Sequence, residues 1–287
     1  MGGGAEMTAS LPRRLFCLLF PPRCRVCGKR VGAVFSDRAC PLLCDACLSA
    51  WRAWQIKPCP VCKVPTSRCR CVPPLLHESG CDTLVSLVPY VSSGRSVPAR
   101  LILRVKEHAD RPLFRFFADS LALPVWQELI RLGAAAGNGG NGSPGDAPNR
   151  VPDSTIDGTP DDFRDRVVVT FVPRRPAAVR LTGLDQAALI ARALAGALEL
   201  PWARLLHHSG RHSMKTAQKY LSADERVASA RRAYSLRRGE TDLSGKTVVL
   251  VDDICTTGAS LAACARLLLL HGAENVLAVT VGRTRDE

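Results

Sequence analysis

The C-terminal half of the chain alternates between short apolar runs and longer Ala- and Leu-rich segments. Three continuous apolar runs, rich in β-branched residues, predict strands buried on both faces: 166–173, 246–253 and 275–282. The segments 185–200 and 258–271 predict helices, the second followed by Gly272 as its C-terminal cap. A further helix is predicted over 222–234 and a short strand over 203–209. This alternation predicts an α/β fold with a mostly parallel sheet flanked by helices.

The N-terminal half has a less regular pattern. Within the mixed segment 82–132, the second part has helical apolar spacing, with possible breaks at Pro112 and Pro124. The next segment, 133–162, is rich in Gly, Pro, Asn and Asp, so it cannot bury enough apolar surface to order itself. We therefore expect a disordered insertion there.

Composition and charge narrow the class of protein. The chain has 287 residues, of which 46% are hydrophobic and 23% charged, which indicates a globular protein of roughly two domains. The net charge of +13 favours anionic partners such as phosphates or nucleic acid. The chain has no run of the roughly 18 apolar residues that a spanning helix needs, and we expect a cytoplasmic protein.

Ten of the thirteen cysteines fall between Cys17 and Cys71, and their spacing indicates metal binding. Two CxxC pairs are separated by the interval typical of zinc ribbons: Cys24, Cys27, Cys44 and Cys47. Four thiolates in tetrahedral geometry suit Zn²⁺. A second possible set ends in a tighter C-x-C pair, for which Cys81 could replace one ligand: Cys59, Cys62, Cys69 and Cys71. We expect a zinc-ribbon domain over 13–81, possibly double, and a second domain over 82–287.

The stretch VVLVDDICTTGAS, residues 248–260, combines two kinds of ligand-binding chemistry. Asp252 and Asp253 follow a buried strand, and ligands of parallel sheets bind beyond the carboxyl ends of strands. Next come the start of a helix and its hydroxyl donors, in the order Thr256, Thr257, Gly258, Ala259 and Ser260. Backbone N–H groups at a helix N-terminus bind phosphate, whereas carboxylates suit sugar hydroxyls or Mg²⁺. A sugar 5-phosphate with free hydroxyls would satisfy both halves.

VVLVDDICTTGAS resembles the phosphoribosyl-pyrophosphate (PRPP) signature of type I phosphoribosyltransferases. The CxxC ribbon, VPRRPAAVRLTGLDQA and KTAQKYLSADERVASARRAY extend the likeness to the ComF family of competence-associated proteins. That family joins an N-terminal zinc ribbon to a phosphoribosyltransferase-like domain. The likeness covers most of residues 13–283, apart from the insertion.

The resemblance assigns roles to individual residues. It implies that Asp252 and Asp253, the candidate catalytic pair, hold the ribose hydroxyls, and that residues 256–260 hold the 5-phosphate. Basic positions of the family, which suit the pyrophosphate, are matched by five residues: Arg174, Arg175, Arg180, Lys215 and Arg226. Lys215 and Arg226 would belong to a mobile segment over the site.

Three positions depart from the family's pattern. Thr182 and Asp185 stand where the family has Arg and Asn, and Ser229 replaces another Asn. These departures argue against catalytic turnover more than they argue against PRPP binding. For the basic residues, solvated surface charge is the alternative reading.

Two classes of function are compatible with these features. The first is a Mg²⁺- and PRPP-dependent phosphoribosyltransferase, which the resemblance links to DNA uptake and natural transformation or to nucleotide metabolism. The second is a non-catalytic ribose-phosphate sensor whose basic surface contacts single-stranded DNA or a DNA-uptake ATPase. Aromatic residues make up only 5% of the chain, which weakens direct recognition of single strands by stacking.

Overall fold

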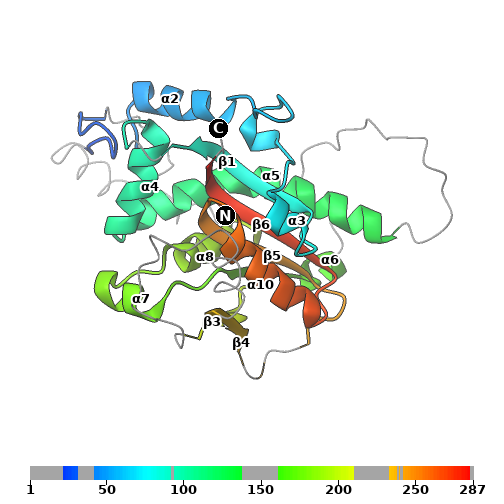
Figure 1. Cartoon of the computed structure of the whole chain (residues 1–287). Helices are drawn as coiled ribbons and strands as arrows, with labels where there is room; N and C mark the ends of the chain where they lie inside the picture. The colour runs from blue at the N-terminus through cyan, green and yellow to red at the C-terminus, as the bar shows by residue number, and fades with distance from the viewer. Residues whose placement is uncertain are drawn as a thin grey trace, which may run out of the picture.

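A four-stranded parallel sheet with the order β1–β6–β5–β2 forms the centre of the protein (Figure 1). The computed structural model describes residues 22–31, 42–91, 94–137, 161–209, 233–237, 239 and 242–284. The strands of the sheet are β1 (Thr83–Tyr90), β2 (Val167–Phe171), β5 (Thr247–Cys255) and β6 (Asn275–Thr284). The three predicted strands and the parallel α/β class are confirmed. β1 lies in the segment for which the sequence predicted no strand.

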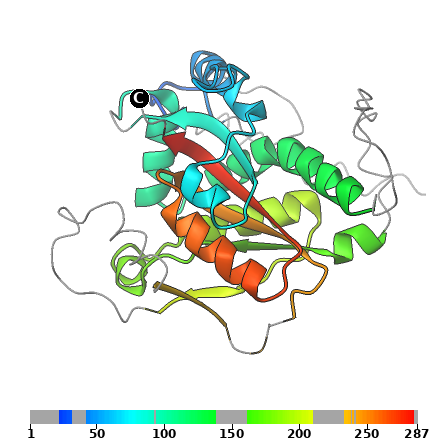
Figure 2. The ribbon, with the colours of Figure 1, turned by 45° about the vertical axis from the view of Figure 1, so that its right-hand side comes forward.

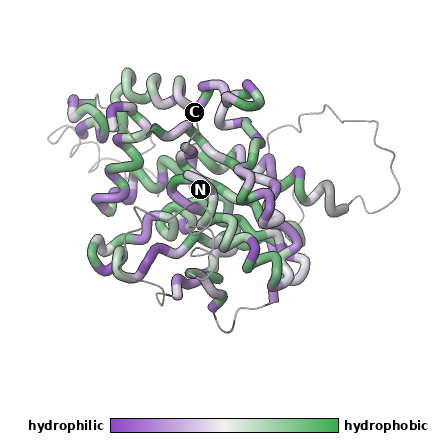
Figure 3. Tube along the Cα trace, viewed as in Figure 1, coloured by the Kyte–Doolittle hydropathy of each residue, from purple (hydrophilic) through white to green (hydrophobic). Residues whose placement is uncertain are grey.

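Both faces of the sheet are buried, as the continuous apolar runs predicted. Because successive side chains of a strand point to opposite faces, Val169 of β2 and Val249 of β5 belong to one hydrophobic cluster. Their neighbours Val168 and Val248 belong to a second cluster on the other face. Figure 3 shows hydrophobic colouring along the central strands, whose residues are mostly buried. The sheet therefore needs helices on both sides.

The helices divide between the two faces accordingly. The first face is covered by α2 (Asp45–Gln55), α4 (Val97–Glu107), α5 (Arg111–Gly137) and α8 (Gln186–Leu198). The second is covered by α3 (Pro74–His77) and α10 (Ala259–Leu270). In Figure 2, the orange α10 lies in front of the sheet and the yellow-green α8 behind it. Among the described residues, no helix has both the length and the apolarity to cross a membrane.

Several element boundaries differ from the predictions. Pro112 is the second residue of α5, which fits a break before it, but Pro124 lies inside the same helix. α5 continues through Gly137, so the segment predicted as an insertion begins as helix, and 138–160 lie outside the described residues. The predicted helix 222–234 is wrong at its end, because Tyr234 begins a strand; most of that segment lies outside the described residues.

Smaller elements complete the structure. β3 (Leu206–His208), within the predicted 203–209, pairs antiparallel with β4 (Tyr234–Leu236). The remaining elements are η1 (Thr66–Arg68), α6 (Asp161–Asp165) and α7 (Pro176–Thr182).

The N-terminal cysteine region packs directly on the body of the protein. Trp51 of α2 is buried, and its ring centroid lies 5.5 Å from that of Phe116 and 5.7 Å from that of Phe117, both on α5. Cys24 and Cys47 belong to the same hydrophobic cluster as these rings. The first cysteine cluster is therefore embedded in the main core.

Candidate functional site

A cavity of about 780 Å³ opens at the carboxyl ends of β2 and β5. It is lined by eight of the residues that the sequence singled out: Arg174, Arg175, Asp252, Asp253, Thr256, Thr257, Ala259 and Ser260. Gly258 is buried and Arg180 is exposed on α7, and neither lines the cavity. Lys215 and Arg226 lie outside the described residues. The fold thus brings together residues from two strand ends that are distant in sequence.

Residues 256–260, which lead into α10, form one wall of the cavity, and we call them the phosphate loop. Gly258 is the N-cap of α10 and has a φ of 80°, in the left-handed region that glycine adopts without strain. A β-carbon at Gly258 would lie 3.4 Å from Cβ of Pro73, so a proline supports the loop from behind. The hydroxyl of Thr257 accepts a hydrogen bond from the N–H of Ala259 at 3.4 Å. The first turn of α10 presents its other N–H groups and the positive end of its dipole to the cavity edge, as anion sites do.

The acidic pair forms the opposite part of the site. Oδ1 of Asp252 accepts from the N–H of Asp253 at 2.8 Å, and Oδ1 of Asp253 accepts from that of Ile254 at 2.7 Å. Burial, and then the charge of Asp253, raise the pKa of Asp252 well above its usual range. The second oxygen of Asp252 remains for a hydroxyl group or a cation, whereas that of Asp253 already faces a lysine, described next.

Lys106 is a site residue that sequence reasoning missed. It comes from α4, lines the cavity, and places Nζ 3.5 Å from Oδ2 of Asp253. A single lysine in an amphipathic helix gives no pattern that would have marked it.

The loop after β2 is held by a network that includes the unusual TGLDQ segment. The N–H of Arg174 donates to Oδ2 of Asp185 at 3.2 Å, and Nη1 of Arg174 donates to Oε1 of Gln186 at 2.9 Å. Nη1 also donates to the hydroxyl of Thr182. Nε2 of Gln186 in turn donates to the carbonyl oxygen of Lys106 at 3.2 Å. Arg174 therefore orders its own loop through the very positions that depart from the family's pattern.

Asp185 has a second task in the same network. Its Oδ1 accepts from the N–H of Ala188 and caps α8, while burial raises the pKa of the carboxyl. Arg175, which follows Arg174 in the chain, is exposed and lines the cavity.

The β3–β4 pair supplies a wall that the sequence did not predict. The rings of His208 and Tyr234 meet edge to face at 5.2 Å, and both line the cavity. Burial, and then the charge of Arg175, lower the pKa of His208. Burial raises the pKa of Tyr234. Because Tyr234 was predicted to end a helix, its role was missed.

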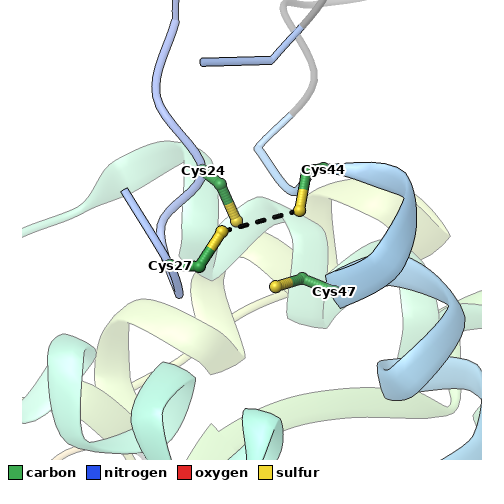
Figure 4. A group of neighbouring side chains, drawn as sticks. All are labelled: Cys24, Cys27, Cys44 and Cys47. Carbon is green, nitrogen blue, oxygen red and sulfur yellow. Dashed lines mark hydrogen bonds between the residues drawn. The ribbon is translucent and has the colours of Figure 1, made fainter. Parts of the chain in front are cut away.

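Both predicted cysteine clusters have the geometry of a metal site. Within each cluster the four sulfur atoms lie within 4.8 Å of one another. The Sγ atoms of Cys27 and Cys44 are 3.6 Å apart, and those of Cys62 and Cys69 are 3.5 Å apart. A tetrahedral zinc with Zn–S bonds of about 2.3 Å separates its sulfurs by about 3.8 Å, so both clusters fit this ion. Figure 4 shows the first cluster, with the sulfurs of the two CxxC pairs facing one another.

The thiols of the second cluster differ in acidity. Burial opposes ionisation of Cys59, but the N–H groups of Cys62 and Val61, together with the thiols of Cys69 and Cys62, outweigh it and lower its pKa to about 6. Burial raises the pKa of Cys69. Such a split is expected where several thiols share one site, and a bound cation would favour the thiolate form of all four.

The other described cysteines belong to the core. Cys81, considered as a replacement ligand, is fully buried and its thiol donates to the carbonyl of Val276 at 3.2 Å, so that alternative is wrong. Cys255 and Cys264 are also buried.

Comparison with known proteins agrees with this geometry. Residues 181–286 match the phosphoribosyl transferase domain family, a region that contains β5, the phosphate loop and α10. The protein therefore carries a phosphoribosyltransferase-like domain, built on a parallel sheet and preceded by cysteine clusters that could hold zinc.

A more specific likeness covers a short segment. Over 37 residues the chain is 60% identical to a ribose-phosphate pyrophosphokinase of Marinomonas sp. (strain MWYL1). The segment amounts to 13% of this chain and spans only 12% of that protein's length.

Proposed function

We propose that the cavity binds PRPP together with Mg²⁺, and that the protein acts as a phosphoribosyltransferase on an acceptor yet to be identified. One observation carries the proposal: the acidic pair and the phosphate loop line the same cavity, at the carboxyl end of β5. Its volume of about 780 Å³ is in the range of small-molecule sites.

Each part of PRPP would contact a different set of residues in the cavity. The 5-phosphate would lie at the phosphate loop, where N–H groups and hydroxyls gather. The ribose hydroxyls would donate to the carboxylates of Asp252 and Asp253, with Lys106 beside Oδ2 of Asp253. Lys106 and Arg175 are cations on the cavity wall that suit the pyrophosphate. Lys215 and Arg226, from the segment predicted to cover the site, would add to this charge.

Mg²⁺ fits the donor set, because carboxylate oxygens are its preferred protein ligands and it keeps much of its coordination for phosphates and water. When bound with PRPP, it would neutralise charge on the pyrophosphate. Asp252 and Asp253 are the residues that would hold it.

The chain's own residues would support transfer by positioning and charge. In the reaction, the bond between C1 of the ribose and the pyrophosphate oxygen breaks, and pyrophosphate leaves with the electron pair. A lone pair of the acceptor forms the new bond at C1. The residues around the cavity would fix the ribose and the leaving group and limit access of water, which is the main task in such a displacement.

Calorimetry tests the binding site. Wild type should bind PRPP in the presence of Mg²⁺, and Asp252→Asn/Asp253→Asn should lose at least about tenfold in affinity. The matched control is Asp119→Asn/Asp165→Asn, which removes two exposed carboxylates elsewhere and should bind as wild type does. A well-folded wild type that binds no PRPP would refute the proposal.

Pyrophosphate release from PRPP, measured across a panel of bases and nucleic acids, separates catalysis from sensing. Release with one acceptor supports the transferase; binding without release supports the non-catalytic sensor. The ComF type, and with it the link to DNA uptake, to single-stranded DNA or to a DNA-uptake ATPase, stays a prediction from the resemblance.

A further inference from the structure

The two cysteine clusters lie in different environments. Cys24 and Cys47 of the first cluster belong to the main hydrophobic cluster together with Trp51. The second cluster sits in residues 57–71, which we call the second knuckle. None of its four cysteines belongs to either of the hydrophobic clusters of the described residues.

The second knuckle packs on the body through η1, which lies against β1 and buries Thr66, and Cys59 and Cys69 are buried as well, but the rest of it has little packing. Val61 is 75% exposed and Val64 is 40% exposed, so its larger apolar side chains face solvent. An ion pair joins it to the body, with Nε of Arg70 2.7 Å from Oε1 of Glu128, but Arg70 is mostly exposed. Because the knuckle has few apolar side chains of its own, we expect a bound metal to fix the arrangement of its four cysteines.

The residues that directly follow the second knuckle touch the phosphate loop. Pro73 follows Cys71 by two residues, and Cβ of Pro73 supports the loop at Gly258. Leu76 of α3 lies on the same side, 3.7 Å from the position that a β-carbon of Gly258 would take. The position of the second knuckle thus determines where Pro73 and Leu76 support the phosphate loop.

A second connection runs through the end of β6. Nη1 of Arg283 donates a hydrogen bond to the carbonyl oxygen of Cys71. The hydroxyl of the next residue, Thr284, donates to the carbonyl oxygen of Cys255 at 3.5 Å. Cys255 directly precedes the phosphate loop, so the same strand end holds the knuckle and the start of the loop.

The space between the knuckle and the loop is not filled by side chains. A cavity of about 510 Å³ is lined on one side by Cys59, Cys69 and Cys71 and on the other by Thr256 and Thr257. A knuckle that lost its metal would have room to move into this cavity, and Pro73 would move with it.

We propose that Cys59, Cys62, Cys69 and Cys71 form a metal site that holds the phosphate loop in its binding geometry, so that ribose-phosphate affinity depends on metal bound there. The inference rests on the proposed function of the main cavity. It assigns different tasks to the two clusters: the first stabilises the core, and the second positions the site.

The test uses the full chain, with ribose 5-phosphate as the probe in calorimetry and zinc content measured by mass spectrometry. Cys62→Ser/Cys69→Ser should lose one of two zinc ions, keep its circular dichroism spectrum, and bind ribose 5-phosphate roughly tenfold more weakly. If the variant loses the zinc and keeps wild-type affinity, the inference is wrong. A wild type with zinc only at the first cluster would also overturn it.

A second variant leaves every cysteine in place. Pro73→Gly removes the ring and β-carbon that support Gly258, so it should keep two zinc ions and still bind ribose 5-phosphate more weakly. Unchanged affinity in this variant would contradict the proposed coupling even if the cysteine variant did not fold. Failure of zinc-loaded wild type to bind the probe would instead refute the proposed function, and the inference with it.

Discussion

Nζ of Lys106 lies 3.5 Å from Oδ2 of Asp253, and this pair joins α4 to the end of β5 inside the main cavity. Two neighbouring carboxylates would repel the anionic ligand that we propose for the phosphate loop. Lys106 compensates part of that charge from a helix far away in the sequence. The site is therefore an assembly of both halves of the chain, although the family match begins at residue 181.

We predict that Lys106→Gln weakens PRPP binding. Loss of the cation leaves Asp253 uncompensated beside the ligand, at a cost on the order of 1 kcal/mol, or roughly fivefold in the dissociation constant. Calorimetry measures this change. Arg100→Gln removes the same charge from an exposed position of α4 and should have little effect. Equal losses in the two variants would mean that only the net charge matters.

The titration of His208 should report on Arg175. In wild type, burial and the charge of Arg175 keep the pKa of His208 below its usual value of about 6.5. Arg175→Gln removes the nearby positive charge, so the pKa of His208 should rise. Inorganic phosphate bound beside Arg175 should raise it in wild type as well. Histidine ring signals in NMR titrations measure both shifts, and Arg180→Gln, exposed on α7, is the control that should leave the pKa unchanged.

The same lowered pKa has a consequence for stability. A histidine whose folded-state pKa is below the unfolded value stabilises the fold above about pH 6.5, and this contribution is lost as the pH falls through the folded pKa. Arg175→Gln brings the two pKa values closer, so its stability should fall less between pH 7 and pH 5 than that of wild type. Urea unfolding at both pH values measures the difference, and a larger loss in the variant would contradict the assignment.

Gly258→Ala should damage the phosphate loop. Alanine is strained at a φ of 80°, and its β-carbon would lie against Pro73, so we expect a loss of about 1 kcal/mol in stability. Displacement of the loop should also weaken binding of ribose 5-phosphate. Gly196→Ala, in α8 with open space around a β-carbon, should be neutral or stabilising. Wild-type affinity in Gly258→Ala would show that the loop does not bind the phosphate.

Loss of metal from the first cluster should destabilise the whole fold. Cys24→Ser/Cys47→Ser removes ligands from inside the core that holds Trp51. We expect a loss of about 3 kcal/mol, or roughly 10 °C in the thermal midpoint, measured by calorimetry. Cys62→Ser/Cys69→Ser should shift the midpoint much less. Equal shifts would show that the two clusters share one structural task.

The parallel sheet could be predicted because its strands are buried on both faces and read as continuous apolar runs. β1 could not, since Ser86 and Pro89 interrupt its apolar pattern. Ser86 is tolerated because its hydroxyl pairs with that of Thr280 on the adjacent β6 at 2.6 Å, a cross-strand contact that local sequence does not reveal.

In the candidate site, too, some residues could be recognised from local sequence and others only from the fold. Residues 252–260 form one local motif, and local motifs can be recognised from sequence. Lys106, His208 and Tyr234 reach the cavity from separate elements, so only the fold brings them there. Asp185 had been interpreted only as a departure from a family pattern, whereas its two hydrogen bonds give it a structural task as a helix cap.

The strand order β1–β6–β5–β2 also limits when the sheet can form during synthesis of the chain. β6 comes after every other strand of the sheet in the chain, yet it lies between β1 and β5 and pairs with both. Until β6 has left the ribosome, β1 and β5 present unpaired edges to the cell's chaperones and proteases. A chain that ends before residue 275 would therefore leave β1 outside the sheet and join its two halves only through helix packing such as that of α5 on α8, and we expect such a product to be degraded rapidly.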